Sequence, residues 1–147
     1  MDRPLPWSDN FAVGHAGLDT QHYRLVELIN DVGIAVRSDM NPERLSALLK
    51  VLRVAVEDHI RQEDSLLWEI KSGTYAPLKD RPRTTYFLEA MAGAAFDEHM
   101  AEHKTLLARF DAIVSAPVDT LCHALKAWFL DHAIKHDAQL KTLFQAM

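Results

Sequence analysis

Hydrophobic side chains recur at intervals of three and four residues along four long stretches of the chain. This spacing places them on one face of an α-helix, whereas a β-strand would alternate apolar and polar residues. In the first stretch the shared face consists of Leu18, His22, Leu25, Val26 and Ile29. The four stretches cover about residues 18–37, 42–70, 94–114 and 119 almost to the C-terminus. The pattern therefore predicts four helices and no sheet.

The residues that interrupt helices fall between these stretches. Asn41 is placed to cap the second helix, with Pro42 in its first turn, and Gly73 follows its last residues. Pro117 ends the third helix, and Asp119 is expected to cap the fourth. Long helices joined mainly by short loops pack antiparallel, so we expect an all-α, up-down four-helix bundle.

The segments outside these helices complete one domain. Trp7, Phe11 and Val13 are expected to anchor an N-terminal arm that lies extended across the bundle. A length of 147 residues fits a single domain, which we assign to residues 1–147. The connection between the second and third helices is extended.

Composition excludes several classes of function. The chain has 16 Lys and Arg against 21 Asp and Glu, so it carries no basic surface suited to nucleic acid. No stretch approaches the ~18 apolar residues of a membrane span, and the N-terminus lacks the apolar region of a secretory signal. The single cysteine, Cys122, excludes an internal disulfide and fits a reducing compartment. We therefore expect a cytoplasmic protein.

Histidine is unusually frequent, with eight residues, and several lie on the apolar helical faces. Residues four apart differ by only about 40° around a helix, so each such pair points in one direction. Burying these polar groups without partners would cost several kcal/mol, whereas a pair of cations would use their lone pairs and negative charge. Imidazoles and carboxylates suit iron, zinc or manganese. The candidate ligands are His22, His59, Glu63, His99, His103 and His132, together with His136 or Asp137.

The choice between His136 and Asp137 is not settled by spacing. His136 lies four residues after His132, whereas five residues rotate Asp137 by about 140° on a regular helix. Regular geometry therefore favours His136. Two further histidines, His15 and His123, fall outside these motifs and are expected to face solvent or cap a helix.

The motifs together resemble the hemerythrin family, and especially its single-domain bacterial members. The resemblance spans nearly the whole chain and rests on four segments: Trp7 to His22, His59-x-x-x-Glu63, His99-x-x-x-His103, and Trp128-x-x-x-His132-x-x-x-x-Asp137. It implies a non-haem di-iron centre that binds dioxygen reversibly. By this resemblance His99, His103 and His132 would hold one iron, and His22 and His59 the other. Glu63 and Asp137 would bridge them beside an oxo or hydroxo group, which favours Asp137 over His136.

The walls of the oxygen pocket follow less directly from the pattern. Trp128 lies one turn before His132 and Leu125 about two turns before, so both are expected to approach the irons. Leu66, Leu67 and Trp68 follow Glu63 and could close the other side. A tryptophan at such spacing is by default a core residue, and core packing alone would explain Trp128.

The chain departs from the family between Glu63 and His99. Roughly twenty extra residues, about 73–94, intervene, and this length exceeds ordinary bundle connections. Its apolar residues follow a helical rhythm: Tyr86, Phe87, Leu88, Met91 and Phe96. We expect the third helix to be extended at its N-terminal end, or preceded by a short helix broken near Gly93. An apolar extension exposed beyond the bundle could shield the site or pair with a second copy; a tolerated surface insertion is equally consistent.

The leading hypothesis is therefore an oxygen carrier, store or scavenger and not an enzyme. The alternatives are a sensor of oxygen or redox state, a di-iron oxidase, ferroxidase or peroxidase, and a zinc or manganese bundle without oxygen chemistry. The ferritin-like oxidases use more carboxylate ligands and Glu-x-x-His motifs. A first shell of five histidines and two carboxylates is less suited to that oxidation chemistry.

Overall fold

The molecule is an all-α bundle. The computed structural model describes residues 3–38, 41–78 and 82–147, without the side chains of 82–87, and none of these residues forms a strand. Two short 3-10 turns are η1 (Asp9–Phe11) in the arm and η2 (Ala76–Leu78) after the second helix. The helices are α1 (Ala16–Arg37), α2 (Pro42–Ser72), α3 (Pro82–Val114) and α4 (Val118–Leu130), which continues through a π-helical turn, η3 (Asp131–His136), into α5 (Ala138–Gln145).

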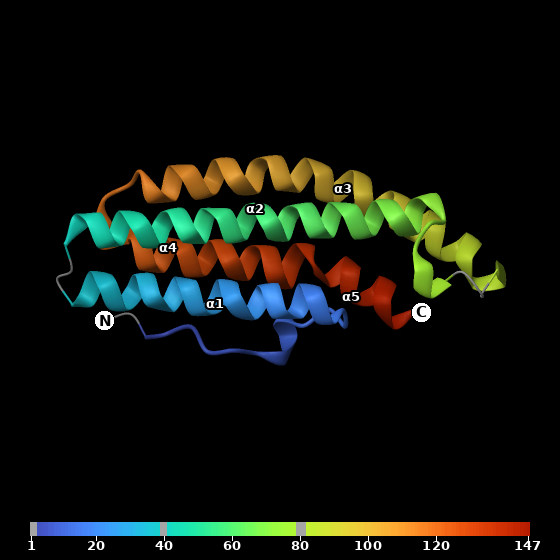
Figure 1. Ribbon diagram of the computed structural model, residues 1–147, viewed down its shortest axis with the longest axis horizontal. Coiled ribbons are helices and arrows are strands. Elements are labelled where there is room, and N and C mark those ends of the chain that lie inside the picture. Colours follow the sequence, from blue (N-terminus) through green and yellow to red (C-terminus); the bar gives the residue numbers. More distant parts are fainter. Residues whose placement is uncertain (1–2, 39–40, 79–81) are drawn as a thin grey trace.

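Consecutive long helices run in opposite directions, as expected for an up-down bundle. Figure 1 shows the links from α1 to α2 and from α3 to α4 at one end, and the link from α2 to α3 at the other. The N-terminal arm runs along the bundle before it turns into α1 (Figure 1). None of the described helices has the length and apolar character needed to cross a lipid bilayer.

The helix ends follow local chemistry, with one exception. The Asn41 side chain accepts a hydrogen bond from the Arg44 amide at 2.8 Å, which confirms it as the cap of α2. Gly73 ends that helix at a φ of 76°, where a side chain would be strained. The expected cap at Asp119 is wrong: α4 starts one residue earlier, after Pro117, and Asp119 lies in its first turn. Proline at that boundary already fixes the backbone direction.

The N-terminal arm is fastened to α1. Asn30 accepts a hydrogen bond from the Leu5 amide at 2.7 Å and donates one to the Leu5 carbonyl at 2.8 Å. Phe11 and Val13 are buried, and the Phe11 ring packs edge-on against Phe129. Phe11 and Val13 therefore anchor the arm across the bundle, as expected, whereas Trp7 is half-buried.

A polar layer divides the interior into two apolar clusters. Along α2 the buried residues pass from Leu52 and Val56 through His59 and Glu63 to Ile70. The other three helical segments repeat this sequence of apolar, polar and apolar burial. The first cluster contains Leu25, Val26, Ile29, Leu52, Val56, Leu106, Phe110, Leu121, Leu125, Trp128 and Phe129. The second contains Val13, Leu18, Leu66, Leu67, Ile70, Leu78, Leu88, Ala92, Ala95, Leu140 and Leu143.

The extra residues lengthen α3, and the larger of its apolar side chains described from Leu88 to Ala92 are buried or half-buried. Helix α3 runs unbroken through Gly93, as the first of the two expected arrangements requires. Leu88 and Ala92 are fully buried in the second cluster with residues of α2, η2 and α5, so the expectation of an apolar extension exposed beyond the bundle is wrong for them. The reason is that α2 and α5 also continue beyond the polar layer and cover this end. Residues 79–81 and the side chains of Tyr86 and Phe87 lie outside the described part of the chain.

Candidate metal centre

Seven polar side chains meet in the layer between the two apolar clusters. They come from all four helical segments, and each is at most 4% exposed. The seven are His22 of α1, His59 and Glu63 of α2, His99 and His103 of α3, and His132 and Asp137 of η3 and its C-cap. The structure therefore brings together all seven positions that the hemerythrin motifs indicate.

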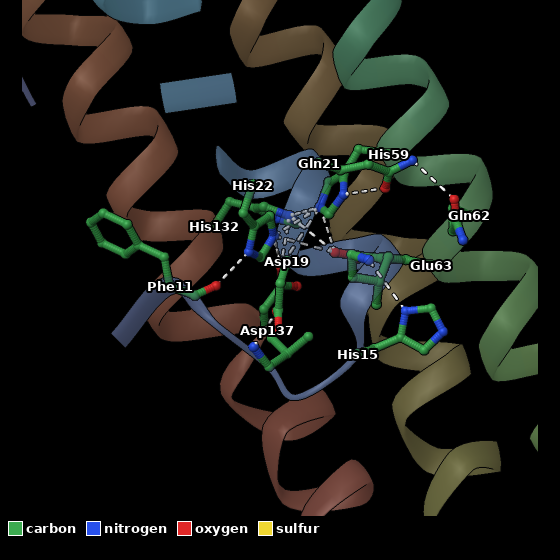
Figure 2. A network of polar contacts seen from close by, with 12 residues as sticks. Phe11, His15, Asp19, Gln21, His22, His59, Gln62, Glu63, His132 and Asp137 are labelled. Carbon is green, nitrogen blue, oxygen red and sulfur yellow. Dashed lines mark hydrogen bonds and ion pairs between the residues drawn. The ribbon is translucent and has the colours of Figure 1, made fainter. Parts of the chain in front are cut away.

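Three imidazoles direct their Nε2 atoms at one point. His59 Nε2 lies 3.1 Å from His22 Nε2 and 3.0 Å from His132 Nε2. Figure 2 shows these rings and the carboxylates of Glu63 and Asp137 pointing toward one another from different helices. The sequence resemblance groups His132 with His99 and His103, whereas its Nε2 here lies beside that of His59.

Each of the two carboxylates faces imidazoles of both groups that the resemblance implies. One group is His22 and His59, and the other is His99, His103 and His132. Glu63 Oε1 lies 2.5 Å from His59 Nε2, and its Oε2 lies 3.0 Å from His103 Nε2. Asp137 Oδ2 lies 2.8 Å from His22 Nε2, and its Oδ1 lies 3.3 Å from His99 Nε2. A carboxylate whose oxygens serve different sets of nitrogens is placed to bridge two cations.

The π-helical turn η3 explains why Asp137 and not His136 enters the layer. The Asp137 amide donates to the His132 carbonyl at 3.0 Å, a bond across five residues. The wider turn brings Asp137 back to the face of His132, from which a regular helix would rotate it by about 140°. His136 is 23% exposed and its Nε2 lies 3.6 Å from Asp131 Oδ2.

The outer nitrogens of four imidazoles are held by hydrogen-bond partners. His22 Nδ1 pairs with the Phe11 carbonyl at 2.6 Å and His99 Nδ1 with the Ala95 carbonyl at 2.9 Å. The other two Nδ1 atoms, of His59 and His103, pair with Gln21 Oε1 at 3.0 Å and Asp64 Oδ1 at 2.8 Å. An acceptor at Nδ1 fixes the proton there and leaves the Nε2 lone pair for a metal.

Burial and charge act in opposite directions on these groups. Burial disfavours charge, so it lowers the pKa of an imidazole and raises that of a carboxyl. At His103 the contacts with Asp64 and Glu63 overcome burial and raise the pKa to about 9. Against burial and the charge of Asp137, the imidazoles of His59 and His132 hold the pKa of Glu63 below its ordinary value. Without metal, these contacts therefore favour the imidazolium form of His103 and the carboxylate form of Glu63.

Protonation alone leaves some of these buried oxygen and nitrogen atoms without a partner. Glu63 Oε1 and Asp137 Oδ2 are buried and accept no hydrogen bond of ordinary geometry from any described residue. When His22 and His59 are neutral with their protons on Nδ1, their Nε2 atoms, 3.1 Å apart, face each other as two lone pairs with no proton between them. One donor atom from each of five residues lies within 4.8 Å of all the others: His22, His59, Glu63, His132 and Asp137. Converging nitrogen and oxygen donors of this kind fit transition-metal cations.

The expected pocket walls divide into core residues and one exposed residue. Leu125 and Trp128 are buried in the first cluster, and the Trp128 indole donates to the Leu106 carbonyl at 3.1 Å, so core packing accounts for both. Leu66 and Leu67 are buried in the second cluster, but Trp68 is 53% exposed and cannot close the site. The ring that meets the centre is Phe129, edge-on to His22 with centroids 5.9 Å apart.

Several polar neighbours of the centre were not singled out from the sequence. Gln21 and Asp64 orient His59 and His103, and each lies one residue from a ligand position in the chain. Glu102 lies next to His103 and faces His132, with Oε1 3.5 Å from His132 Nδ1. Their adjacency to ligands was the only available signal, because their partners lie on other helices. His15 has the capping role expected of it and accepts from the Leu18 amide at 3.2 Å.

A buried layer of imidazoles and carboxylates inside a four-helix bundle defines a cation-binding helical domain. A family model described as the hemerythrin HHE cation-binding domain matches residues 13–144. The chain therefore belongs to the hemerythrin family. Comparison with curated proteins and with solved structures gives no match.

Proposed function

We propose that this protein binds dioxygen reversibly at a centre of two iron ions, as a carrier, store or scavenger. His99, His103 and His132 would hold one iron, and His22 and His59 the other. The second ion would then have fewer protein ligands and an open position for dioxygen. The observation that carries the proposal is the convergence of five buried imidazoles on two carboxylates that face both groups.

The composition of the donor set favours oxygen binding. Two ferrous ions would supply the two electrons that dioxygen takes up when it binds. Five neutral imidazoles and two carboxylates offset only part of the charge of two divalent ions, which leaves room for one further anion. The apolar clusters on both sides of the layer keep bulk water away from it.

Metal analysis and an absorption spectrum test this proposal together. Protein purified without added metal should contain two irons per chain and be coloured in air. The colour should bleach when oxygen is removed and return when air is admitted. A colourless protein that contains zinc refutes the proposal, and rapid turnover of hydrogen peroxide with a reducing dye would instead favour an enzyme.

Sensing of oxygen or redox state is a second candidate, favoured by one contact. The backbone carbonyl of Phe11, in the arm, accepts from His22 Nδ1 at 2.6 Å (Figure 2). Movement of His22 on ligand binding would therefore reach the arm directly. Limited proteolysis of the arm in the oxygenated and deoxygenated states tests this: equal cleavage rates would contradict a sensor role.

A further inference from the structure

The wall around the polar layer is thinnest beside His103. Of the seven residues of the centre, His103 is the most exposed, at 4%. Outside it the exposed fraction of the side chains rises to 9% at Glu102 and 24% at Asp64. Both outer side chains are carboxylates, so the approach from solvent on this side is acidic.

Glu102 contacts two imidazoles of the centre at once. Its Oε1 lies 3.5 Å from His132 Nδ1, and its Oε2 lies 3.6 Å from His103 Nε2. One donor atom from each of Glu102, His103 and His132 lies within 4.8 Å of the other two. This trio has the size of a cation site; it shares His132 with the group of five but contains neither of the bridging carboxylates.

Two atoms of this trio are buried without hydrogen bonds. Among the described residues, Glu102 Oε2 and His132 Nδ1 have no hydrogen-bond partner. His132 is the one imidazole of the five whose outer nitrogen makes no hydrogen bond with a described residue. Buried polar atoms are costly to leave without hydrogen bonds. A cation held between the Glu102 carboxylate and the imidazoles of His103 and His132 would satisfy both atoms.

We propose that Glu102, His103 and His132 form an outer site for a divalent cation, through which iron passes into the buried centre. The outer site and the centre share His103 and His132, so the outer site holds a cation only in transit. His103 Nε2 lies 3.0 Å from Glu63 Oε2, and a cation that leaves Glu102 therefore meets a carboxylate of the centre next. The step exchanges ligands and transfers no electrons.

The opposite side of the centre is less suited to cations. A cavity of about 180 Å³ between the arm and the η3–α5 segment is lined by Asn10, Asp137 and Lys141 and otherwise by apolar residues. The ammonium group of Lys141 disfavours an approaching cation, whereas Asp64 and Glu102 attract one. The inference rests on the seven-residue centre and not on dioxygen binding.

Loading of the metal-free protein with Fe²⁺, under anaerobic conditions, tests the outer site. The protein is mixed with a coloured ferrous chelate, and the loss of colour gives the rate at which the chain takes up iron. Glu102→Gln should load about tenfold more slowly, because the charge that concentrates the cation is gone. Glu102→Asp should remain within about threefold of the wild-type rate. Glu98→Gln, an exposed position one turn earlier on α3, is the matched control and should load at the wild-type rate.

The final metal content separates a transit role from a structural one. Glu102→Gln should still reach two irons per chain at saturation. Loading at the wild-type rate, equal slowing in Glu98→Gln, or fewer than two irons in Glu102→Gln would each overturn the proposal. The wild-type rate should also fall as salt is added, and a salt-independent rate would contradict the acidic approach without any substitution. If loading depends on Glu102 but no reversible colour appears, dioxygen binding fails and the outer site stands.

Discussion

Replacing Asp137 by alanine should remove one of the two proposed irons and destabilise the metal-free fold. The Asp137 carboxylate lies 2.8 Å from His22 Nε2, 3.1 Å from His132 Nε2 and 3.3 Å from His99 Nε2. Loss of a buried charged partner typically costs about 3–5 kcal/mol. We expect the substitution to lower the unfolding free energy by about 3 kcal/mol at pH 6. The loss should be smaller at pH 9, because the imidazoles beside the missing carboxylate can release their protons there. Denaturant unfolding of chelator-treated protein measures this difference.

The matched control for this substitution is the neighbouring residue. His136→Ala should keep two irons per chain, because its side chain is partly exposed and faces Asp131. Asp137→Ala should hold at most one iron, because no other described residue occupies its place between the two groups of imidazoles. The reasoning from the π-helical turn is refuted if Asp137→Ala retains both irons while His136→Ala loses one.

Three further predictions concern the pH dependence of stability, the hydrogen bond to His103 and the buried extension of α3. In metal-free protein the contribution of His103, whose pKa is raised from 6.5 to about 9, is complete below pH 6.5 and disappears as the pH rises through 9. The lowered pKa values of Glu63 and Asp137 stabilise the fold above the ordinary carboxyl pKa near 4, and this stabilisation is lost only at lower pH. The unfolding free energy should therefore fall by roughly 3 kcal/mol between pH 6.5 and 9, and urea titrations that show no decline would contradict this. Asp64→Asn should weaken metal affinity about 10–100-fold in chelator competition, because His103 Nδ1 loses its charged acceptor, and unchanged affinity would exclude that role. Leu88→Ala should destabilise the loaded protein by about 2–5 kcal/mol, and a negligible change in its thermal midpoint would show that the extension of α3 is not core.

The bundle and most of its centre could be predicted from the sequence because they depend on local periodicity. Pairs such as His59 and Glu63 need only a regular helix to share a face. The Asn41 side chain favours a helix start, and Gly73 tolerates the left-handed backbone of a helix end because it lacks a Cβ atom, so both ends of α2 could be placed. Burial of the polar layer could be predicted from the same spacing, because its residues occupy positions on the apolar helical faces.

The features that spacing could not predict depend on departures from regular geometry or on partners far away in sequence. Asp137 enters the centre only because η3 adds a residue to one turn, and regular spacing favours His136 instead. The contact between Glu102 and His132 becomes visible only when α3 packs beside η3. Trp68 follows a ligand closely but is directed outward, where it packs on Phe96 with ring centroids 5.8 Å apart.

Because a polar layer divides the interior, a bound metal would hold the four helical segments together at the middle of the bundle. Each end of the bundle has its own hydrophobic contacts, and the two ends are joined through side chains whose charges cations would balance. Removal of the metal should therefore loosen the middle before either end. In hydrogen exchange, the amides near His59 and His103 should lose protection first, while those near Leu52 and Leu88 exchange late. The exchange protection of the middle of the bundle would therefore measure how much metal the protein holds.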